Sequence, residues 1–325
     1  MISVIIPTRN RADLLAASLD SLTRQTLVTS EFEIWVIDNG STDNTAQVIR
    51  QYQDRLSNLD SIYAEEPGLH TGRHAGMKAA RGEILVFADD DIEAFPTWLT
   101  AIKESFADES VAMVGGNNLP MFLEPPPAWL KNMWQRTDRR GNHIVTALSI
   151  IEFRKPIKQI SPYLIWGCNF AIRKAVLFAA GGFHPDGMPK ELIRFRGDGE
   201  THVARYVVES GLKCVFNAGA SVYHKVTPER MTFKYFRQRG FNQGVSDSYT
   251  ALRNQDLEII SAKRSLLRKV ASLGLRNVRS LLRNPAERKA LALMAIGHKE
   301  GYDYHQMAYY STPELRAWVH QLQYY

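Results

Sequence analysis

Three consecutive aspartates come at the end of an apolar stretch of the chain. Asp89, Asp90 and Asp91 directly follow residues 83–88, whose sequence EILVFA is typical of a buried strand. Carboxylates this close together repel one another, and a hard divalent cation with oxygen ligands relieves the repulsion. The alternative is a solvated turn, or a cap for a helix near residues 96–99, because Asp is favoured at helix N-termini. The residue types therefore predict either a metal site or a capped turn.

The elements expected around the aspartates favour the metal site. Short apolar segments alternate with amphipathic ones through the first 115 or so residues, which is typical of a parallel α/β sheet. Ligand sites in such sheets lie at the carboxyl ends of strands, where the aspartates stand. The expected strands are residues 2–7, 33–37, 61–64, 83–88 and 111–116, and the expected helices are residues 14–22, 45–52 and 71–80.

Beyond residue 116 the pattern is less regular. We interpret residues 117–160 as a long connection, either a mobile flap over the site or a surface link. The chain beyond His224 has an almost wholly helical pattern. We therefore expect a catalytic domain over residues 1–225 and a helical region over residues 226–325. Within the catalytic domain, later strands are expected at residues 163–166 and 213–216, with a helix at 200–210.

Length and composition bound the class of protein. A chain of 325 residues with 45% hydrophobic content can bury a substantial core. It has no run of 18 apolar residues, and the first strand follows the initiator Met, so we expect neither a spanning helix nor a signal peptide. Cys168 and Cys214 are too few for a disulfide framework or a thiolate zinc site. These features predict a cytoplasmic protein.

Positive charge is concentrated late in the chain. Residues 263–289 hold nine Lys or Arg and one acid, against a net charge of +6 for the whole chain. Their spacing predicts a basic amphipathic helix, which would pack on the catalytic domain or a second subunit, or lie on the inner face of an anionic membrane. A homo-oligomer and a peripheral membrane contact are thus both open. No nucleic-acid-binding motif accompanies the charge, so nucleic acid is not an expected partner.

Four segments occur in an order typical of a known family: residues 4–10 (VIIPTRN), 36–43 (VIDNGSTD), 72–76 (GRHAG) and 87–91 (FADDD). Together they resemble the family-2 glycosyltransferases, which have the GT-A fold. Matches at residues 167–173, 181–183 and 222–224 extend the resemblance over roughly residues 1–244.

The family resemblance implies a fold and an activity. The fold is a Rossmann-like mixed α/β sheet flanked by helices. The activity is the inverting transfer of a sugar, hexosyl for example, from a nucleoside-diphosphate sugar to a hydroxyl acceptor. A UDP-sugar is the favoured donor, and the acceptor is a growing glycan, a lipid carrier, a protein or a small molecule. Such enzymes serve polysaccharide or glycoconjugate biosynthesis, including that of the cell envelope.

The resemblance also implies where the donor binds. An acid at a strand end can accept hydrogen bonds from a nucleobase or a ribose hydroxyl, and Pro and Gly let the backbone approach a flat ring. Arg73 would pair with phosphate, unless it is a surface charge on a helix. The residues implied for the nucleotide-sugar are Pro7, Thr8, Arg9, Asp38, Gly40, Arg73, Asp89 and Asp90.

The family's Asp-x-Asp motif maps onto Asp89 and Asp91, with Asp90 between them. This mapping implies that Asp91 binds a metal and that Asp89 binds the ribose or the metal's water shell. His224 matches a histidine that completes the metal site in related enzymes, although an isolated histidine at a strand end is more often packed. Ligand hardness indicates Mg²⁺ or Mn²⁺, and an imidazole ligand favours Mn²⁺.

An inverting transfer needs a general base for the acceptor hydroxyl. The family usually supplies a Glu-Asp pair after the Gly-Gly-Phe segment, but here residues 196–201 read RGDGET. Alignment places Asp198 over the pair, and the start of the helix also admits Glu200. A helix N-terminus would keep either carboxylate ionised, and the alternative is that both only cap the helix. On the acceptor side the resemblance implies Trp166, Asn169 and Arg239, with Trp166 stacking on a sugar or buried in the core.

Two other functions compete with this interpretation. A sugar-phosphate nucleotidylyltransferase has a related sheet and metal-binding acids, but the chain lacks the Gly-rich N-terminal loop of such enzymes. A noncatalytic nucleotide-sugar sensor or membrane scaffold could keep the same fold. Release of nucleoside diphosphate from the donor would identify a transferase, and release of pyrophosphate would identify a nucleotidylyltransferase.

Overall fold

The computed structural model describes residues 1–155, 157–254 and 284–325. The larger of its two sheets has seven strands in the order β11-β6-β10-β4-β1-β2-β3. Strand β10 runs antiparallel to both of its neighbours, while the other pairs are parallel, so the sheet is mixed. The strands are β1 (Ile2–Thr8), β2 (Phe32–Asp38), β3 (Leu59–Tyr63), β4 (Ile84–Ala88), β6 (Val111–Gly115), β10 (Asn169–Arg173) and β11 (Lys213–Phe216).

Helices cover both faces of this sheet, as the apolar sequences of its central strands require. Alternate side chains of β1 enter opposite cores: Val4 and Ile6 pack in one core, and Ile5 packs in the other. The first core contains residues of α1 (Ala12–Leu22), α2 (Thr45–Gln53) and α4 (Trp98–Ser105), and the second contains residues of α3 (Leu69–Ala79), α6 (Lys174–Ala179) and α7 (Glu200–Glu209).

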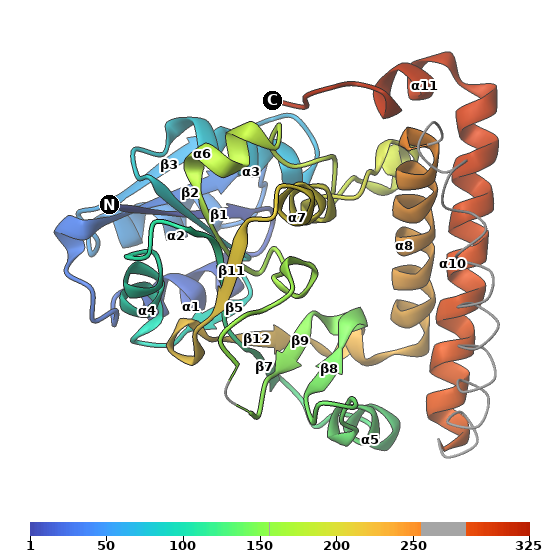
Figure 1. Ribbon diagram of the computed structural model, residues 1–325, viewed down its shortest axis with the longest axis horizontal. Helices are drawn as coiled ribbons and strands as arrows, with labels where there is room; N and C mark the ends of the chain where they lie inside the picture. The colour runs from blue at the N-terminus through green and yellow to red at the C-terminus, as the bar shows by residue number, and fades with distance from the viewer. Residues whose placement is uncertain (156, 255–283) are drawn as a thin grey trace.

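A second sheet of five strands lies below the first in Figure 1, in the order β5-β12-β7-β9-β8. Its strands are β5 (Ile92–Ala94), β12 (Val222–Val226), β7 (Asn118–Phe122), β9 (Ile150–Glu152) and β8 (His143–Val145), and α5 (Ala128–Gln135) packs beside it. The interpretation of residues 117–160 as a flap or surface link is therefore wrong. Buried Leu130, Leu148 and Ile150 pack in a separate core that this segment shares with β12, α8 (Phe233–Arg253) and α10 (Pro285–Ser311).

The expected strand at residues 163–166 is also wrong. Residues Pro162–Leu164 form a 3₁₀ helix, and the next strand is β10, which starts at Asn169. Pro162 precedes the expected strand and is the first residue of the 3₁₀ helix. An apolar run of four residues does not by itself distinguish a strand from a helical turn. The strand expected at residues 213–216 and the helix expected at 200–210 are confirmed as β11 and α7.

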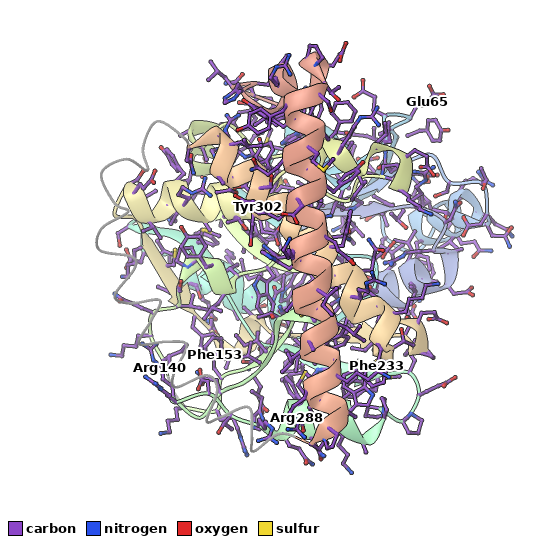
Figure 2. All side chains as sticks on the ribbon, turned by 90° about the vertical axis from the view of Figure 1, so that its right-hand side faces the viewer. Glu65, Arg140, Phe153, Phe233, Arg288 and Tyr302 are labelled. Carbon is purple, nitrogen blue, oxygen red and sulfur yellow. The ribbon has the colours of Figure 1, made fainter. Side chains whose placement is uncertain are left out.

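The described part of the chain after β12 is helical, as expected. Helices α8 (Phe233–Arg253) and α10 (Pro285–Ser311) lie side by side, and α11 (Pro313–Val319) leads the chain back toward the larger sheet (Figure 1). Figure 2 shows α10 crossing the whole face of the molecule, from Arg288 to beyond Tyr302. Most of the predicted basic amphipathic helix at residues 263–289 lies outside the described residues. None of the described helices is long and apolar enough to span a membrane.

The last residues of the chain dock on the catalytic part. The carbonyl oxygen of Tyr324 lies 3.1 Å from Nδ1 of His74 on α3, and the ring of Tyr325 packs edge-on against the same imidazole. The Tyr324 hydroxyl also hydrogen-bonds the Tyr249 hydroxyl of α8 at 2.8 Å. The helical region thus contacts the larger sheet's helices through its end. The division of the chain into a catalytic domain over residues 1–225 and a helical region over residues 226–325 stays a prediction.

Glycines bring α8 and α10 into backbone contact. A Cβ at Gly244 of α8 would lie 2.0 Å from the carbonyl oxygen of His298, and one at Gly301 of α10 would lie 2.0 Å from that of Phe241. Because the clashing atoms are backbone, no side-chain rotation relieves them. The interface therefore requires residues without a Cβ at these positions.

We expect Gly244→Ala to lower the free energy of unfolding by about 1–3 kcal/mol, the usual cost of overpacking an interface. Denaturant unfolding followed by circular dichroism measures the loss. Met307→Ala on the outer face of α10, where the side chain is 74% exposed, is the control and should leave the midpoint unchanged. An unchanged midpoint for Gly244→Ala would contradict this helix packing.

Candidate active site

A cavity of about 640 Å³ opens at the carboxyl ends of β1 and β4. Side chains from both sheets, α7 and α8 line it, so segments far apart in the sequence meet there. Of the residues expected from the sequence, Asp38, Gly40 and Asn169 are not among those that line it. Those that do are Pro7, Thr8, Arg9, Arg73, Asp89, Asp90, Asp91, Trp166, Asp198, Glu200, His224 and Arg239.

Strand register brings the metal-ligating candidates together. Asn169 pairs with Ala88 in the antiparallel β10–β4 pair, so Cys168 stands next to Asp89. His224 pairs with Ile92 in the β12–β5 pair, and the backbone N–H of Lys225 donates to the carbonyl of Asp91 at 2.8 Å. The strand that carries His224 is thereby fixed beside the aspartates.

Asp90 ties the ends of β1 and β4 together. Its carboxylate accepts hydrogen bonds from the Thr8 hydroxyl at 2.7 Å and from Nη1 of Arg11 at 2.8 Å. Burial raises the pKa of Asp90 to about 6, although Arg11 favours the charged form. Both carboxylate oxygens of Asp90 accept hydrogen bonds from the protein, so this residue holds the ends of β1 and β4 and the start of α1 together.

Asp91 is buried among cationic groups. Its Oδ1 lies 3.2 Å from Nε2 of His224, and its Oδ2 lies 3.3 Å from Nη1 of Arg11 and 3.2 Å from Nη1 of Arg230. Burial opposes ionisation, but the hydrogen bond and charge of His224, together with Arg230 and Arg11, hold the pKa of Asp91 well below its usual range. These contacts favour the ionised form of the carboxylate.

The side chains at this point fit a divalent cation. Ligand atoms of Asp89, Cys168 and His224 all lie within 4.8 Å of one another, and Asp91 contacts the same imidazole. Nδ1 of His224 is buried and has no hydrogen-bond partner among the described residues. Carboxylate oxygen and imidazole nitrogen are donors that Mn²⁺ accepts. The structure thus brings together the predicted Asp89, Asp91 and His224 and adds Cys168.

Arg73 lies between the aspartates and Glu200. Its Nη2 is 3.5 Å from Oδ1 of Asp89, and its Nη1 is 3.5 Å from Oε2 of Glu200. Its side chain is 3% exposed, so the alternative that it is a surface charge is wrong. Burial opposes the charge, but Glu200 and Asp89 raise the pKa of Arg73 above its usual value. A Cβ at Gly167 would lie 2.0 Å from Nη2, so this glycine makes room for the guanidinium.

The two candidate bases differ in their surroundings. Asp198 is buried and accepts hydrogen bonds from His184 at 2.6 Å, Thr250 at 2.8 Å and Arg205 at 3.0 Å. Burial opposes its charge, but His184, Arg205 and Thr250 lower the pKa of Asp198 to about 2. Glu200 begins α7, and its side chain is 24% exposed in the cavity wall. Of the two, Glu200 has the carboxylate that is open to a ligand.

Asp38, Gly40 and Asn169 lie beside the cavity. Asp38 ends β2, where its carboxylate accepts a hydrogen bond from the N–H of Ser41 at 2.8 Å. Gly40 has a φ of +76°, which glycine adopts readily. Asn169 is buried, and its amide accepts from Trp98 Nε1 at 2.9 Å and donates to the Ala220 carbonyl at 3.0 Å. Its role in this structure is to join elements beneath the site.

The two remaining acceptor-side candidates, Trp166 and Arg239, are far apart in the sequence, and both line the cavity. Trp166 is half-buried, and its Nε1 donates to the carbonyl of Tyr163 at 3.2 Å. Arg239 projects from α8. Both positions are compatible with the acceptor-side prediction, which no contact in the structure tests.

Three functional candidates escaped the sequence analysis. Arg11 and Arg230 neutralise Asp91, and Cys168 joins its neighbours at the metal site. The available signals were weak: Arg11 follows the VIIPTRN segment, Arg230 comes six residues after His224, and Cys168 lies inside a matched segment as a small apolar residue. Their contacts depend on strand register, which the sequence analysis did not assign.

Comparison with known proteins now identifies the family. Residues 3–178, more than half of the chain, match the model of glycosyl transferase family 2. The chain belongs to this family. The sequence-based identification is confirmed. The matched range contains the three aspartates and Cys168, and it ends before Asp198 and Glu200.

Individual relatives match over shorter segments. Glycosyltransferase AglE of Haloferax volcanii is 35% identical over 117 residues, which cover 36% of this chain and 38% of AglE. Validoxylamine A glucosyltransferase of Streptomyces hygroscopicus subsp. jinggangensis is 37% identical over 116 residues, which cover 35% of this chain and 27% of that enzyme. These alignments thus span well under half of each relative.

Solved structures confirm the GT-A fold. Mannosyltransferase PcManGT from Pyrobaculum calidifontis, in complex with GDP-Man and Mn²⁺, has a TM-score of 0.60 at 18% identity, over 93% of this chain and 87% of that one. GalNAc-T7 with UDP, GalNAc and Mn²⁺ has a TM-score of 0.51 at 15% identity, over 74% of this chain and 47% of that one. At these identities the likeness establishes the fold.

Asp198→Asn tests the structural role of that carboxylate. A pKa lowered to about 2 from an ordinary 3.8 corresponds to about 2 kcal/mol of stability at pH 7. That contribution is complete above pH 4 and is lost as the pH falls toward 2, because the folded state then takes up the proton too. We therefore expect the variant to be less stable than wild type by about 2 kcal/mol at pH 7, and the difference to shrink below pH 4. Chemical unfolding at a series of pH values measures it, and a constant difference would contradict this assignment.

Proposed function

We propose that the chain is an inverting, metal-dependent glycosyltransferase that moves a sugar from a nucleoside-diphosphate sugar to a hydroxyl acceptor. One observation carries the proposal: the buried Arg73 guanidinium lies 3.5 Å both from Asp89 in the cation-binding cluster and from Glu200. A site for a leaving diphosphate and a carboxylate for the incoming hydroxyl are thus held in one cavity at a fixed spacing. That is the arrangement a single displacement at a sugar carbon requires.

The donor would occupy the strand-end side of the cavity. Pro7, Thr8 and Arg9 line it at the end of β1, and Asp38 and Gly40 lie beside it at the end of β2. One structural neighbour, PcManGT, is in complex with GDP-Man, and another, GalNAc-T7, is with UDP and GalNAc, which supports a nucleotide-sugar donor here. Among the possible donors, we favour a UDP-sugar.

A divalent cation would bind to Asp89, Asp91 and His224. It would supply positive charge to the departing diphosphate when bound. Arg11 and Arg230 already neutralise Asp91, so these cationic side chains also attract the donor's phosphates to this end of the cavity. Mn²⁺ is favoured over Mg²⁺ because the cluster offers an imidazole.

Glu200 is the general base in this proposal. Oε1 of Glu200 is 3.4 Å from the N–H of Gly167, and Arg73 contacts Oε2, so the carboxylate is oriented from two sides. As the acceptor oxygen bonds to the anomeric carbon, the bond to the diphosphate breaks, and the hydroxyl proton passes to Glu200. Asp198, which the alignment favoured, is instead a positioning residue, because its two oxygens are taken by three donors.

The acceptor and the cellular setting are proposed from the names of relatives and from the sequence. One relative, the poly(ribitol-phosphate) beta-glucosyltransferase of Bacillus spizizenii, is named for transfer to a polymer. We therefore propose an acceptor in polysaccharide or glycoconjugate biosynthesis, bound past Trp166 and Arg239. A cytoplasmic enzyme held at the inner face of a membrane through residues 263–289, or paired with a second copy, remains part of the proposal. Family membership supports the transferase over a nucleotidylyltransferase or a scaffold.

A donor panel tests the proposal. With Mn²⁺ present, we expect one of several UDP-, GDP- and dTDP-sugars to be hydrolysed slowly with release of nucleoside diphosphate. Chelation and Asp91→Ala should each abolish the release, because the first removes the cation and the second removes its ligand. Pyrophosphate as the product would identify a nucleotidylyltransferase, and the absence of any turnover in folded protein would favour a noncatalytic role.

Glu200→Gln separates the two candidate bases. Removing a general base at constant shape should lower kcat by about 10²–10⁴-fold and leave the donor's binding constant nearly unchanged. Steady-state transfer and donor titration measure the two quantities. Glu209→Gln, on the exposed end of the same helix, should retain full activity. Full activity in Glu200→Gln would return Asp198 to the catalytic role.

A further inference from the structure

Cys168 places a thiol in the wall of the cation-binding cluster. The residue is buried and lies in the turn before β10, where the strand register sets it next to Asp89. Each of Asp89, Cys168 and His224 offers one ligand atom, and these three atoms lie within 4.8 Å of one another. A carboxylate, a thiol and an imidazole therefore converge on one point.

The spacing is close to that of a bound transition metal. Zn²⁺ bonds of about 2.0–2.3 Å to oxygen, nitrogen and sulfur separate the ligand atoms of a tetrahedral site by about 3.3–3.8 Å. Ligand atoms within 4.8 Å reach that spacing through side-chain shifts of about 1 Å. The 31% exposure of the Asp89 side chain provides access from the cavity.

Two further features of the His224 and Cys168 side chains point to a ligand. Nδ1 of His224 is buried and lacks a hydrogen-bond partner among the described residues, although most buried polar atoms have one. The sulfur of Cys168 accepts a hydrogen bond from Nδ2 of Asn118 at 3.3 Å. Asn118 is held by Asn169 at 3.2 Å, and Asn169 in turn by Trp98.

This chain of amides is the kind of outer shell that orients a metal-binding thiolate. A neutral N–H donor stabilises negative charge on sulfur without competing for the metal. The hydrogen bond from Asn118 also favours the observed orientation of the Cys168 side chain. Cys214, the other cysteine, is buried in the core on the far side of β6 and has no such neighbours among the described residues.

We propose that Asp89, Cys168 and His224 form a site for a thiophilic divalent cation such as Zn²⁺ or Co²⁺. A thiolate is a soft ligand that these ions accept and that Mg²⁺ does not favour. Binding releases the thiol proton to solvent. The site stands independently of turnover. The site shares Asp89 and His224 with the proposed Mn²⁺ site. Zn²⁺ would therefore displace Mn²⁺ and inhibit sugar transfer, a consequence that rests on the proposed function.

Cobalt spectroscopy tests the site directly. Titration of the full chain with Co²⁺ should produce a sulfur-to-cobalt charge-transfer band in the near ultraviolet. We expect Cys168→Ser and Cys168→Ala to lose that band, and Cys214→Ser to keep it. By calorimetry the two Cys168 variants should bind Zn²⁺ at least about tenfold more weakly and bind Mn²⁺ with unchanged affinity.

The outcomes distinguish this site from the proposed transferase. The same charge-transfer band in wild type and both Cys168 variants, or equal Zn²⁺ affinity, would overturn the thiol ligand. Circular dichroism establishes that each variant is folded, and the Ala and Ser variants guard against a defect specific to one of them. Donor turnover with Mn²⁺ is measured separately: a band without turnover would refute only the transferase, and turnover without a band would refute only this site.

Discussion

The concentration of carboxylates at the end of β4 is the constraint on which the rest of the site depends. Asp90 and Asp91 are buried, and basic side chains from three other elements surround them. Arg11 comes from the start of α1, His224 from β12, and Arg230 from the turn before α8. A buried charge without partners would cost several kcal/mol, so the acids and their partners must assemble together. The site thereby links both sheets to the helical region.

Beyond Arg230, the helical region is tied to the catalytic part at several further points. The Ser246 hydroxyl of α8 donates to the carbonyl of Gly197 at 2.7 Å, and Thr250 near the end of the same helix donates to Asp198. Asp198 therefore couples α7, which carries Glu200, to α8, which carries Arg239 into the cavity. These contacts of Asp198 hold the α7 and α8 walls of the cavity in a fixed relative position, independently of the sugar that binds.

The catalytic half of the fold was predictable because long buried strands leave a clear apolar pattern. Strands β1, β2 and β4 have nearly continuous buried sequences, and the family motifs fall at their ends. Three strands of the second sheet, β5, β8 and β9, have three residues each, too few for a two-residue alternation to be recognised. The strand expected at residues 163–166 failed because apolar content alone does not specify pairing. Strand existence follows from local sequence, whereas the partner of a short strand does not.

The same distinction separates the predicted site residues from those that only the structure supplied. Motif matching located Asp89, Asp91 and His224 because each has its own signal in the sequence. Cys168 has none, because its proximity to Asp89 arises from the pairing of Asn169 with Ala88 across antiparallel strands. Alignment likewise ranked Asp198 above Glu200 by position, but hydrogen bonding decides which carboxylate is available to a substrate. Position in a motif identifies which residues enter a site, and the partners that each one finds there determine its chemical role.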